Sequence, residues 1–325
     1  MYTASQPMNR AICMNSEDRP TPILHHYEAS PYAEKIRLIF GITGLEWQSL
    51  LSPVQPPRPN LDPLTGGYRR IPVLQIGADL YCDTQLIAHV LSELTGNARI
   101  APPATRSSAA ALAERAEGEV FFSAIAAVPP LRTLRTVIGA FGIMGALQFV
   151  SDRQRMMQGG TVRAPAPKQA KAVLQDFAQQ LDTALQKTRF LGGDAPDYTD
   201  LCCFHPLWLN AFVCKQGIGK GYPQIERWQA EIAHIGHGKR IEIQQSSAFD
   251  QALAHPPADL GLSLEHPLLG QNVNVAPTDY GVEPVAGRLV GVGSDRCTVA
   301  RETTAFGTLQ VHFPLAGYEI TARSR

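Results

Sequence analysis

The sequence lacks the features that mark several classes of protein. Its 29 Lys and Arg residues are balanced by 29 Asp and Glu residues, which gives a formal net charge of zero. Because the basic residues are dispersed along the chain, there is no electrostatic footprint for nucleic acid, and we expect no nucleic-acid partner. Charged residues make up only 18% of the chain, whereas the hydrophobic fraction of 44% is ordinary. We therefore expect a soluble globular protein.

Cysteine is sparse and follows no ligand pattern. Six cysteines are spread over 325 residues without a C-x-x-C motif, which excludes a secreted disulfide framework and a zinc-finger pattern. They are Cys13, Cys82, Cys202, Cys203, Cys214 and Cys297. His25 and His26 point to opposite faces of a predicted strand, so they cannot easily share a metal ion. We expect free thiols, a reducing cytoplasmic compartment and no bound metal.

Long hydrophobic runs are also missing. Met1 to Pro20 has no apolar core of the kind found in signal peptides, and we predict a flexible leader over residues 1–20. The most apolar run, Val137 to Val150, is shorter than the ~20 residues that span a bilayer, and it contains Gly and Gln. We predict that it forms a buried helix and that the protein has no membrane partner.

Alternating strands and helices are present in residues 21–97, which predicts a small α/β domain. A Pro-rich loop from Pro53 to Pro63 can support neither a sheet ladder nor a helix. The segment after it reads as a hairpin followed by a helix that Gly96 ends. The predicted strands are Ile23–Tyr27, Leu45–Leu51, Ile71–Ile76 and Leu80–Cys82, and the predicted helices are Tyr32–Gly41 and Asp83–Leu94.

The rest of the chain changes character twice. After a Pro- and Ser-containing linker, residues 105–250 show apolar residues at steps of three and four, which predicts a helical bundle. In residues 259–325, five short alternating runs separated by Gly, Pro and Asp predict a small β-barrel-like module. The sequence contains no internal repeat and no low-complexity tract.

A Ser-Pro pair follows the first predicted strand. Ser30 is a preferred N-cap, and Pro31 suits the first helical position, where no N–H is needed. The pair also has a chemical interpretation, because a hydroxyl at a helix N-terminus sits where unpaired N–H groups and the helix dipole favour an anion. Both interpretations stay open on the sequence alone.

Three short motifs in order resemble the soluble glutathione S-transferase family. They are S-P-Y-x-x-K-I-R from Ser30, R-I-P-V-L from Arg70 and D-T at Asp83, and the resemblance covers about residues 21–249. It implies a thioredoxin-like N-terminal domain, an all-helical second domain, glutathione as co-substrate and a homodimer. The β-rich segment 259–325 departs from the family, whose ordinary members end after the helical domain.

The resemblance also implies which residues bind glutathione. Ser30 would donate a hydrogen bond to the thiolate, with Tyr27 and Tyr32 as less favoured donors. Ile71 and a cis Pro72 would present the backbone to the cysteinyl residue, and Thr84 would hold the γ-glutamyl carboxylate at the helix N-terminus. Asp83 would accept the γ-glutamyl ammonium. Either Arg69 or Arg70 reaches the glycyl carboxylate, or both are solvated loop charges.

The function implied is that of a glutathione transferase, in which the activated thiolate attacks a hydrophobic electrophile. Conjugation, substitution and thiolytic cleavage all share this step. A thiol–disulfide oxidoreductase is disfavoured, because its attacking group would be a protein cysteine and position 30 is serine. The alternative is a non-catalytic binding or scaffold protein that has kept the fold and uses its β-module for a partner.

Overall fold

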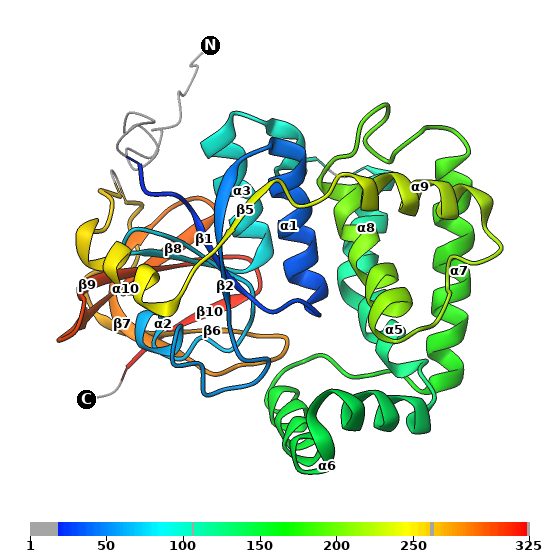
Figure 1. Cartoon of the computed structure of the whole chain (residues 1–325). Coiled ribbons are helices and arrows are strands. Elements are labelled where there is room, and N and C mark those ends of the chain that lie inside the picture. The colour runs from blue at the N-terminus through cyan, green and yellow to red at the C-terminus, as the bar shows by residue number, and fades with distance from the viewer. Residues whose placement is uncertain (1–18, 106, 261–262, 324–325) are drawn as a thin grey trace. The chain divides into compact units, whose positions relative to one another are not determined.

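The computed structural model describes residues 19–105, 107–260 and 263–323 (Figure 1). Residues 1–18, with Cys13 and most of the predicted leader, lie outside the described residues. The chain divides into two compact units. The first holds residues 46–94, 240–325 and the segment up to Tyr27, and the second holds residues 28–45 and 95–239. The domain boundaries expected from the sequence, 21–97, 105–250 and 259–325, remain a proposal.

The first unit is built on a single ten-stranded sheet with the order β10-β6-β7-β8-β9-β4-β3-β1-β2-β5. Within its N-terminal part, β1 pairs parallel to β2 and antiparallel to β3, and β3 forms a hairpin with β4. The elements are β1 (Ile23–His26), β2 (Glu46–Leu51), α2 (Asp62–Thr65), β3 (Val73–Ile76), β4 (Asp79–Cys82), α3 (Thr84–Thr95), β5 (Lys239–Glu242) and α10 (Gln245–Ala254). The α/β order predicted for this region is confirmed.

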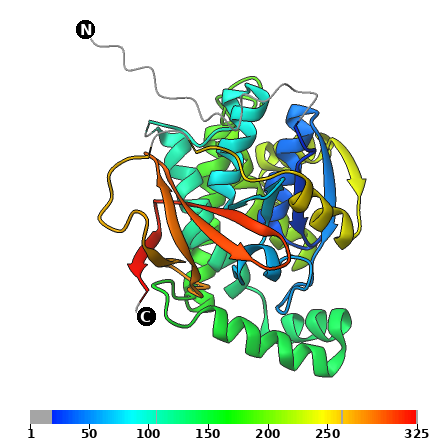
Figure 2. The ribbon, with the colours of Figure 1, turned by 90° about the vertical axis from the view of Figure 1, so that its left-hand side faces the viewer.

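The C-terminal extension contributes the five strands that the sequence predicts, and they extend the same sheet (Figure 2). They are β6 (Asn272–Pro277), β7 (Val285–Val292), β8 (Arg296–Thr303), β9 (Gly307–Pro314) and β10 (Tyr318–Ala322). The junction is a parallel pairing of β9 with β4, in which Leu80 lies opposite Val311. The sequence predicted a small β-barrel-like module. In the structure, β9 of the extension instead pairs with the edge of β4, so the extension continues the sheet of the N-terminal part.

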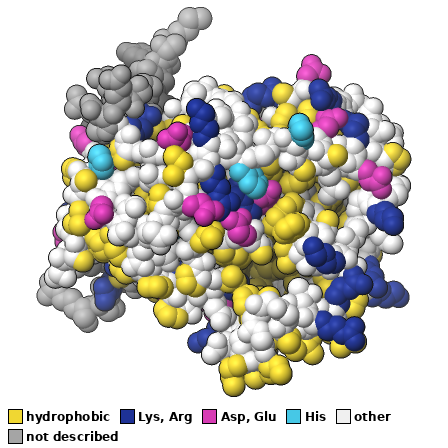
Figure 3. Space-filling view, viewed as in Figure 1, with side chains coloured by type: hydrophobic (Ala, Val, Ile, Leu, Met, Phe, Trp, Pro, Cys, Tyr) yellow, Lys and Arg dark blue, Asp and Glu magenta, His cyan; other side chains and the backbone are white. Residues whose placement is uncertain are grey.

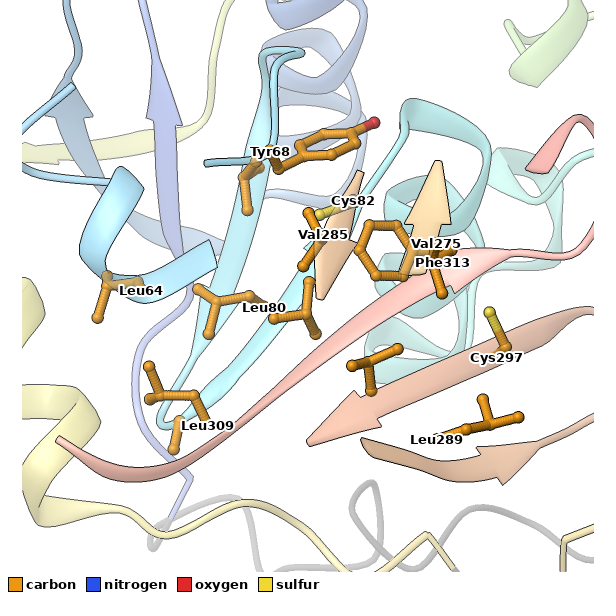
Figure 4. Close-up of a cluster of buried hydrophobic side chains, with 14 of the residues drawn as sticks. Leu64, Tyr68, Leu80, Cys82, Val275, Val285, Leu289, Cys297, Leu309 and Phe313 are labelled. Atoms are coloured by element: carbon orange, nitrogen blue, oxygen red, sulfur yellow. The ribbon is translucent and has the colours of Figure 1, made fainter. Parts of the chain in front are cut away.

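One hydrophobic core serves both parts of this sheet. Leu64, Leu80 and Cys82 of the N-terminal part are buried in the same cluster as residues of the extension (Figure 4). The extension contributes the buried side chains of Val273, Val275, Val285, Leu289, Val299, Leu309, Val311 and Phe313. The extension is therefore an integral part of this unit.

The second unit is helical, as predicted. Its helices are α1 (Pro31–Thr43), the 3-10 turn η2 (Ala98–Ile100), α4 (Ser108–Arg115), α5 (Phe121–Ala126), α6 (Pro130–Met156), α7 (Pro167–Leu185), α8 (Tyr198–Trp208) and α9 (Pro223–His234). Two π-helical turns, η3 (Ala116–Val120) and η4 (Leu209–Val213), follow α4 and α8. Asp197 and Asp200 form a capping box at the start of α8.

Helix α6 differs from its prediction, because it is exposed and not buried. Ile143, Met144 and Leu147 are 72%, 70% and 63% exposed, and Figure 3 shows hydrophobic side chains over α6 at the bottom of the view. Gly142, with φ 69° and ψ 176°, kinks the helix in the middle. Apolar composition predicts burial only where another element covers the helix. By length and composition alone α6 is long and apolar enough to cross a membrane, a test that core helices of soluble proteins also pass.

Candidate active site

Ser30 caps helix α1, as the sequence predicts. Its Oγ accepts a hydrogen bond from the Ala33 N–H at 3.2 Å, and its carbonyl accepts one from the Glu34 N–H at 2.9 Å. Pro31 follows at the first helical position, and the Ser30 side chain is almost completely buried. A hydroxyl both accepts and donates, so the capping bond leaves the hydroxyl proton of Ser30 available to an anion. The structural and the chemical interpretations of Ser30 are therefore compatible.

A buried charged cluster holds the first turn of α1. Arg37 Nη2 pairs with Glu34 Oε2 at 2.7 Å, and His237 Nε2 lies 3.1 Å from Glu34 Oε1. Burial opposes ionisation of Glu34, but the hydrogen bond from His237 and the charge of Arg37 keep its pKa below its usual value. The sequence did not reveal this cluster, because His237 lies next to two glycines that suggest a fraying helix end.

Tyr32 lies in an aromatic cluster. Its ring centroid is 4.7 Å from that of Phe121 and 4.8 Å from that of His205, and its hydroxyl donates to the Glu117 carbonyl at 3.5 Å. Burial keeps the pKa of His205 well below its usual value, so the imidazole is neutral. These contacts occupy the Tyr32 side chain with packing.

A cavity of about 320 Å³ lies in the helical unit. Phe122 and Ser123 of α5 and Val173 of α7 are among its lining residues. Phe122 brings an aromatic ring to the lining of this cavity. Phe121, by contrast, is buried against Tyr32.

The Ile71–Pro72 peptide bond is cis, as the family resemblance implies. Val73 is the first residue of this segment that pairs in the sheet, opposite His25 on one side and Cys82 on the other. The backbone of Ile71 therefore lies outside the ladder, where a peptide ligand could pair with it.

Asp83 and Thr84 begin helix α3. Asp83 has φ 76°, a left-handed conformation that is uncommon for residues other than glycine and that is often found at functional sites. Its Oδ1 accepts a hydrogen bond from the Gln85 N–H at 3.0 Å, which caps the helix. Thr84 is the first residue of the twelve-residue helix and is 6% exposed. The helix N-terminus at Thr84 is suited to a carboxylate.

Neither Arg69 nor Arg70 is a solvated loop charge, so that alternative is wrong. Their side chains are only 5% and 12% exposed. Arg69 faces Glu283 at 3.6 Å, whereas Arg70 forms an ion pair with Asp279 and lies 3.7 Å from Asp83. The sequence could not show these partners of Arg69 and Arg70, because Asp279 and Glu283 belong to the extension.

The predicted site residues fall into two groups. Ser30 and Tyr32 belong to the helical unit, and residues 70–72, 83 and 84 belong to the sheet unit. Within the sheet unit, the structure brings Arg70 and Asp83 together.

No described cysteine has the lowered pKa of a reactive thiolate. All five are unpaired, and burial raises the pKa of Cys297 to about 12 and those of Cys82, Cys202 and Cys203 well above their usual range. Burial also raises the pKa of Cys214. These thiols are poor nucleophiles, in agreement with the argument against an oxidoreductase. Among the described residues, no cluster of His, Cys, Asp and Glu could hold a metal ion.

Comparisons with known proteins identify the family to which the chain belongs. The sequence model "Glutathione S-transferase, N-terminal domain" matches residues 24–99. A GST-like protein from Pseudomonas syringae is 30% identical, with a TM-score of 0.73, and the match covers 93% of this chain and 99% of that one. Among curated proteins, none matches the sequence.

Two further solved structures are less similar. A glutathione S-transferase domain-containing protein from Marinobacter aquaeolei is 15% identical over 65% of this chain and 97% of its own, with a TM-score of 0.47. A maleylacetoacetate isomerase from Anaeromyxobacter dehalogenans, with dicarboxyethyl glutathione and citrate in its active site, is 18% identical over 67% of this chain and 92% of its own, with a TM-score of 0.40. The match to the Pseudomonas protein, which runs through the extension, shows that the chain belongs to the soluble glutathione S-transferase family.

Proposed function

We propose that the protein is a glutathione transferase in which Ser30 stabilises the thiolate of bound glutathione. The observation that carries the proposal is the geometry of the Ser30 hydroxyl at the N-terminus of α1. Its oxygen accepts from the Ala33 N–H, so its proton is the part of the group left to donate. The thirteen-residue helix adds a positive dipole end at the same place.

The energies are sufficient for this role. A free thiol has a pKa of ~8.5, and lowering it by ~2 units takes ~2.7 kcal/mol of preferential stabilisation of the anion. A hydroxyl that donates to an anion contributes ~1.5–3 kcal/mol, and a helix N-terminus adds ~0.3–2 kcal/mol. Together they make the thiolate the main species near neutral pH. The thiolate then attacks an electrophilic carbon of a hydrophobic compound, by conjugation, substitution or thiolytic cleavage.

The remaining contacts of glutathione follow the family. Ile71, beside Pro72, pairs with the cysteinyl backbone, Thr84 binds the γ-glutamyl carboxylate, and Asp83 accepts the γ-glutamyl ammonium. Tyr32 and Arg70 are positioning residues in this proposal, because both are occupied by other protein groups. We also propose a cytoplasmic homodimer with a role in detoxification. A sedimentation mass of 35.3 kDa, that of one chain, would contradict the dimer.

The test is an ultraviolet titration of the thiolate in the glutathione complex. Ser30→Ala should still bind glutathione but raise the apparent pKa of its thiol by about 1–2 units, which corresponds to one lost hydrogen bond to an anion. Ser107→Ala is the matched control, because Ser107 caps α4 through the Ala110 N–H in the same way. Titration curves that coincide for Ser30→Ala and wild type would remove Ser30 from the mechanism. A lowered thiol pKa without turnover of any electrophile in a panel would favour the scaffold alternative.

A further inference from the structure

A tyrosine of the C-terminal extension reaches the start of helix α3. The Tyr318 hydroxyl, on β10, lies 2.6 Å from the Tyr68 hydroxyl and 3.4 Å from Asp83 Oδ2. An ionised carboxylate only accepts hydrogen bonds, so Tyr318 donates to Asp83 and accepts from Tyr68. The three side chains form a relay that runs from Tyr68 through Tyr318 to Asp83.

Both hydroxyls of this relay stay protonated. Burial raises the pKa of Tyr68 and of Tyr318 well above the usual value. The Tyr68 ring lies at the border of the shared core with its oxygen pointing away from the cluster, as Figure 4 shows. The ring of Tyr318 packs 5.7 Å from that of Phe313, which fixes its position. The hydroxyl of Tyr318 is therefore held in place by packing as well as by the relay.

The carboxylate of Asp83 is held on both oxygens. Oδ1 accepts from the Gln85 N–H at 3.0 Å, and Oδ2 accepts from Tyr318. Arg70 Nη1 lies 3.7 Å from Oδ2, beyond hydrogen-bonding distance. Two acceptor bonds in different directions fix the plane of the carboxylate, whereas the distant guanidinium supplies charge.

The charge of Arg70 is already shared with the extension. Its Nη2 donates to the Tyr280 carbonyl at 2.6 Å and pairs with Asp279, and its guanidinium carbon lies 4.0 Å from the centre of the Tyr280 ring. One guanidinium therefore faces two carboxylates, those of Asp83 and Asp279. The cluster keeps a negative charge that favours a cationic ligand group.

We propose that Tyr318 is a positioning residue of the γ-glutamyl subsite, through which the extension orients Asp83 toward the ammonium group of glutathione. The inference rests on the proposed function and adds to it a role for the extension in recognising the ligand. Asp279 and Tyr280 of the extension hold the Arg70 guanidinium near the Asp83 carboxylate. The ligand group that this arrangement recognises is a primary ammonium next to a carboxylate.

The test compares two ligands on the wild-type protein and four variants by titration calorimetry. The ligands are glutathione and its desamino analogue, glutarylcysteinylglycine, which lacks only the ammonium. Tyr318→Phe should weaken glutathione binding about tenfold and leave binding of the analogue unchanged. Glu319→Gln is the control, because Glu319 is exposed on the same strand and should behave as wild type toward both ligands. Asp83→Asn should also lose the preference for glutathione over the analogue. Adding Tyr318→Phe to Asp83→Asn should have no further effect.

Each outcome is decisive. If Tyr318→Phe weakens the binding of both ligands equally, Tyr318 has only a structural role. If Tyr318→Phe keeps the wild-type preference for glutathione over the analogue, Tyr318 has no role in the subsite. Either result overturns the inference but leaves glutathione binding in place. A wild-type protein that binds neither ligand would overturn the proposed function and the inference with it. Because Tyr318→Phe keeps the ring that packs on Phe313, we expect it to fold, and Asp83→Asn gives an independent measure of the same subsite.

Discussion

His312 Nε2 lies 2.8 Å from Asp79 Oδ1, and this contact bridges the junction between the extension and the N-terminal strands. The carboxylate of Asp79 can only accept, so Nε2 carries the proton. Nδ1 is then free to accept from the Thr298 hydroxyl at 2.9 Å. The Tyr81 ring stacks on the imidazole at 4.4 Å, so residues of β4 and of β8 hold the His312 side chain, which lies on β9.

This Thr-His-Asp order resembles a catalytic triad but has a structural role. Thr298, His312 and Asp79 are 3%, 1% and 4% exposed, so a substrate cannot reach the hydroxyl. A fully satisfied buried network of this kind specifies one arrangement of the strands that contribute to it.

We predict that Asp79→Asn lowers the free energy of unfolding by about 1–3 kcal/mol, because it removes a charged acceptor for buried donors. Asp79 Oδ2 also accepts from the Ala258 N–H at 2.8 Å, so two hydrogen bonds are affected. Urea unfolding measures the change. Glu302→Gln, on an exposed carboxylate of β8, is the control and should be neutral. A stability equal to that of wild type would show that the network does not strengthen the junction.

The shared core leads to a second prediction. Phe313 is 0% exposed, and its ring contacts those of Tyr68 and Tyr318. Phe313→Ala should cost about 3–5 kcal/mol, because it leaves a cavity inside the core on which both parts of the sheet depend. Thermal unfolding should remain a single transition for this unit, at lower temperature. Leu253→Ala, at a position 58% exposed, should change little. Unchanged stability in Phe313→Ala would contradict a common core.

The sequence predicted the elements better than it predicted their partners. Alternating residues identify β9 as a strand, and Ser30-Pro31 identifies the start of α1, because both signals are local. The pairing of β9 with β4 joins residues more than two hundred positions apart, and a strand pattern does not name its partner. The same limit hid the contact of Glu34 with His237.

Helix α6 shows a second limit of prediction from sequence. Its apolar composition predicted a buried helix, but its apolar residues are exposed, because burial depends on a neighbour that local sequence cannot specify. In the candidate site, the capping residues followed from local motifs and the cis proline from the family resemblance, whereas Tyr318 and Asp279 followed from neither. These residues come from the extension, which lies outside the residues that the family motifs cover.

The buried ion pair of Lys35 and Glu117 supports a third prediction. Lys35 is 0% exposed and pairs with Glu117, which is 19% exposed, and its Nζ lies 3.3 Å from the Tyr198 hydroxyl. Glu117→Gln should destabilise the protein by about 3–5 kcal/mol, because it leaves a buried cation without its counter-charge.

The opposite variant, Lys35→Met, should cost less than Glu117→Gln. It leaves a carboxylate that retains some exposure to water, and the methionine fills most of the lysine volume. Urea unfolding of both variants measures the asymmetry. Equal losses, or a larger loss for Lys35→Met, would show that burial of the lysine charge does not dominate this pair.

The last prediction concerns acid stability and His25 of β1. His25 is 0% exposed, and its Nε2 donates to Gln75 Oε1 at 2.8 Å. Burial lowers the pKa of His25 from 6.5 to about 4, against the raising effect of the Gln75 hydrogen bond. Between these two pH values the unfolded chain binds a proton that the folded protein does not. Stability from this residue is therefore complete above pH ~6.5 and falls as the pH drops toward 4.

The size of this loss in stability follows from the lowered pKa of His25. A pKa that falls from 6.5 to about 4 corresponds to about 3 kcal/mol of unfolding free energy lost between pH ~6.5 and 4. His25→Gln keeps a donor for Gln75 without titrating, so its unfolding free energy should fall less steeply over this range. His234→Gln, at an exposed histidine of α9, should keep the wild-type slope. If His25→Gln and wild type lose stability in parallel, His25 is not the group that links folding to protons, and the neutral imidazole of His205 becomes the next to test.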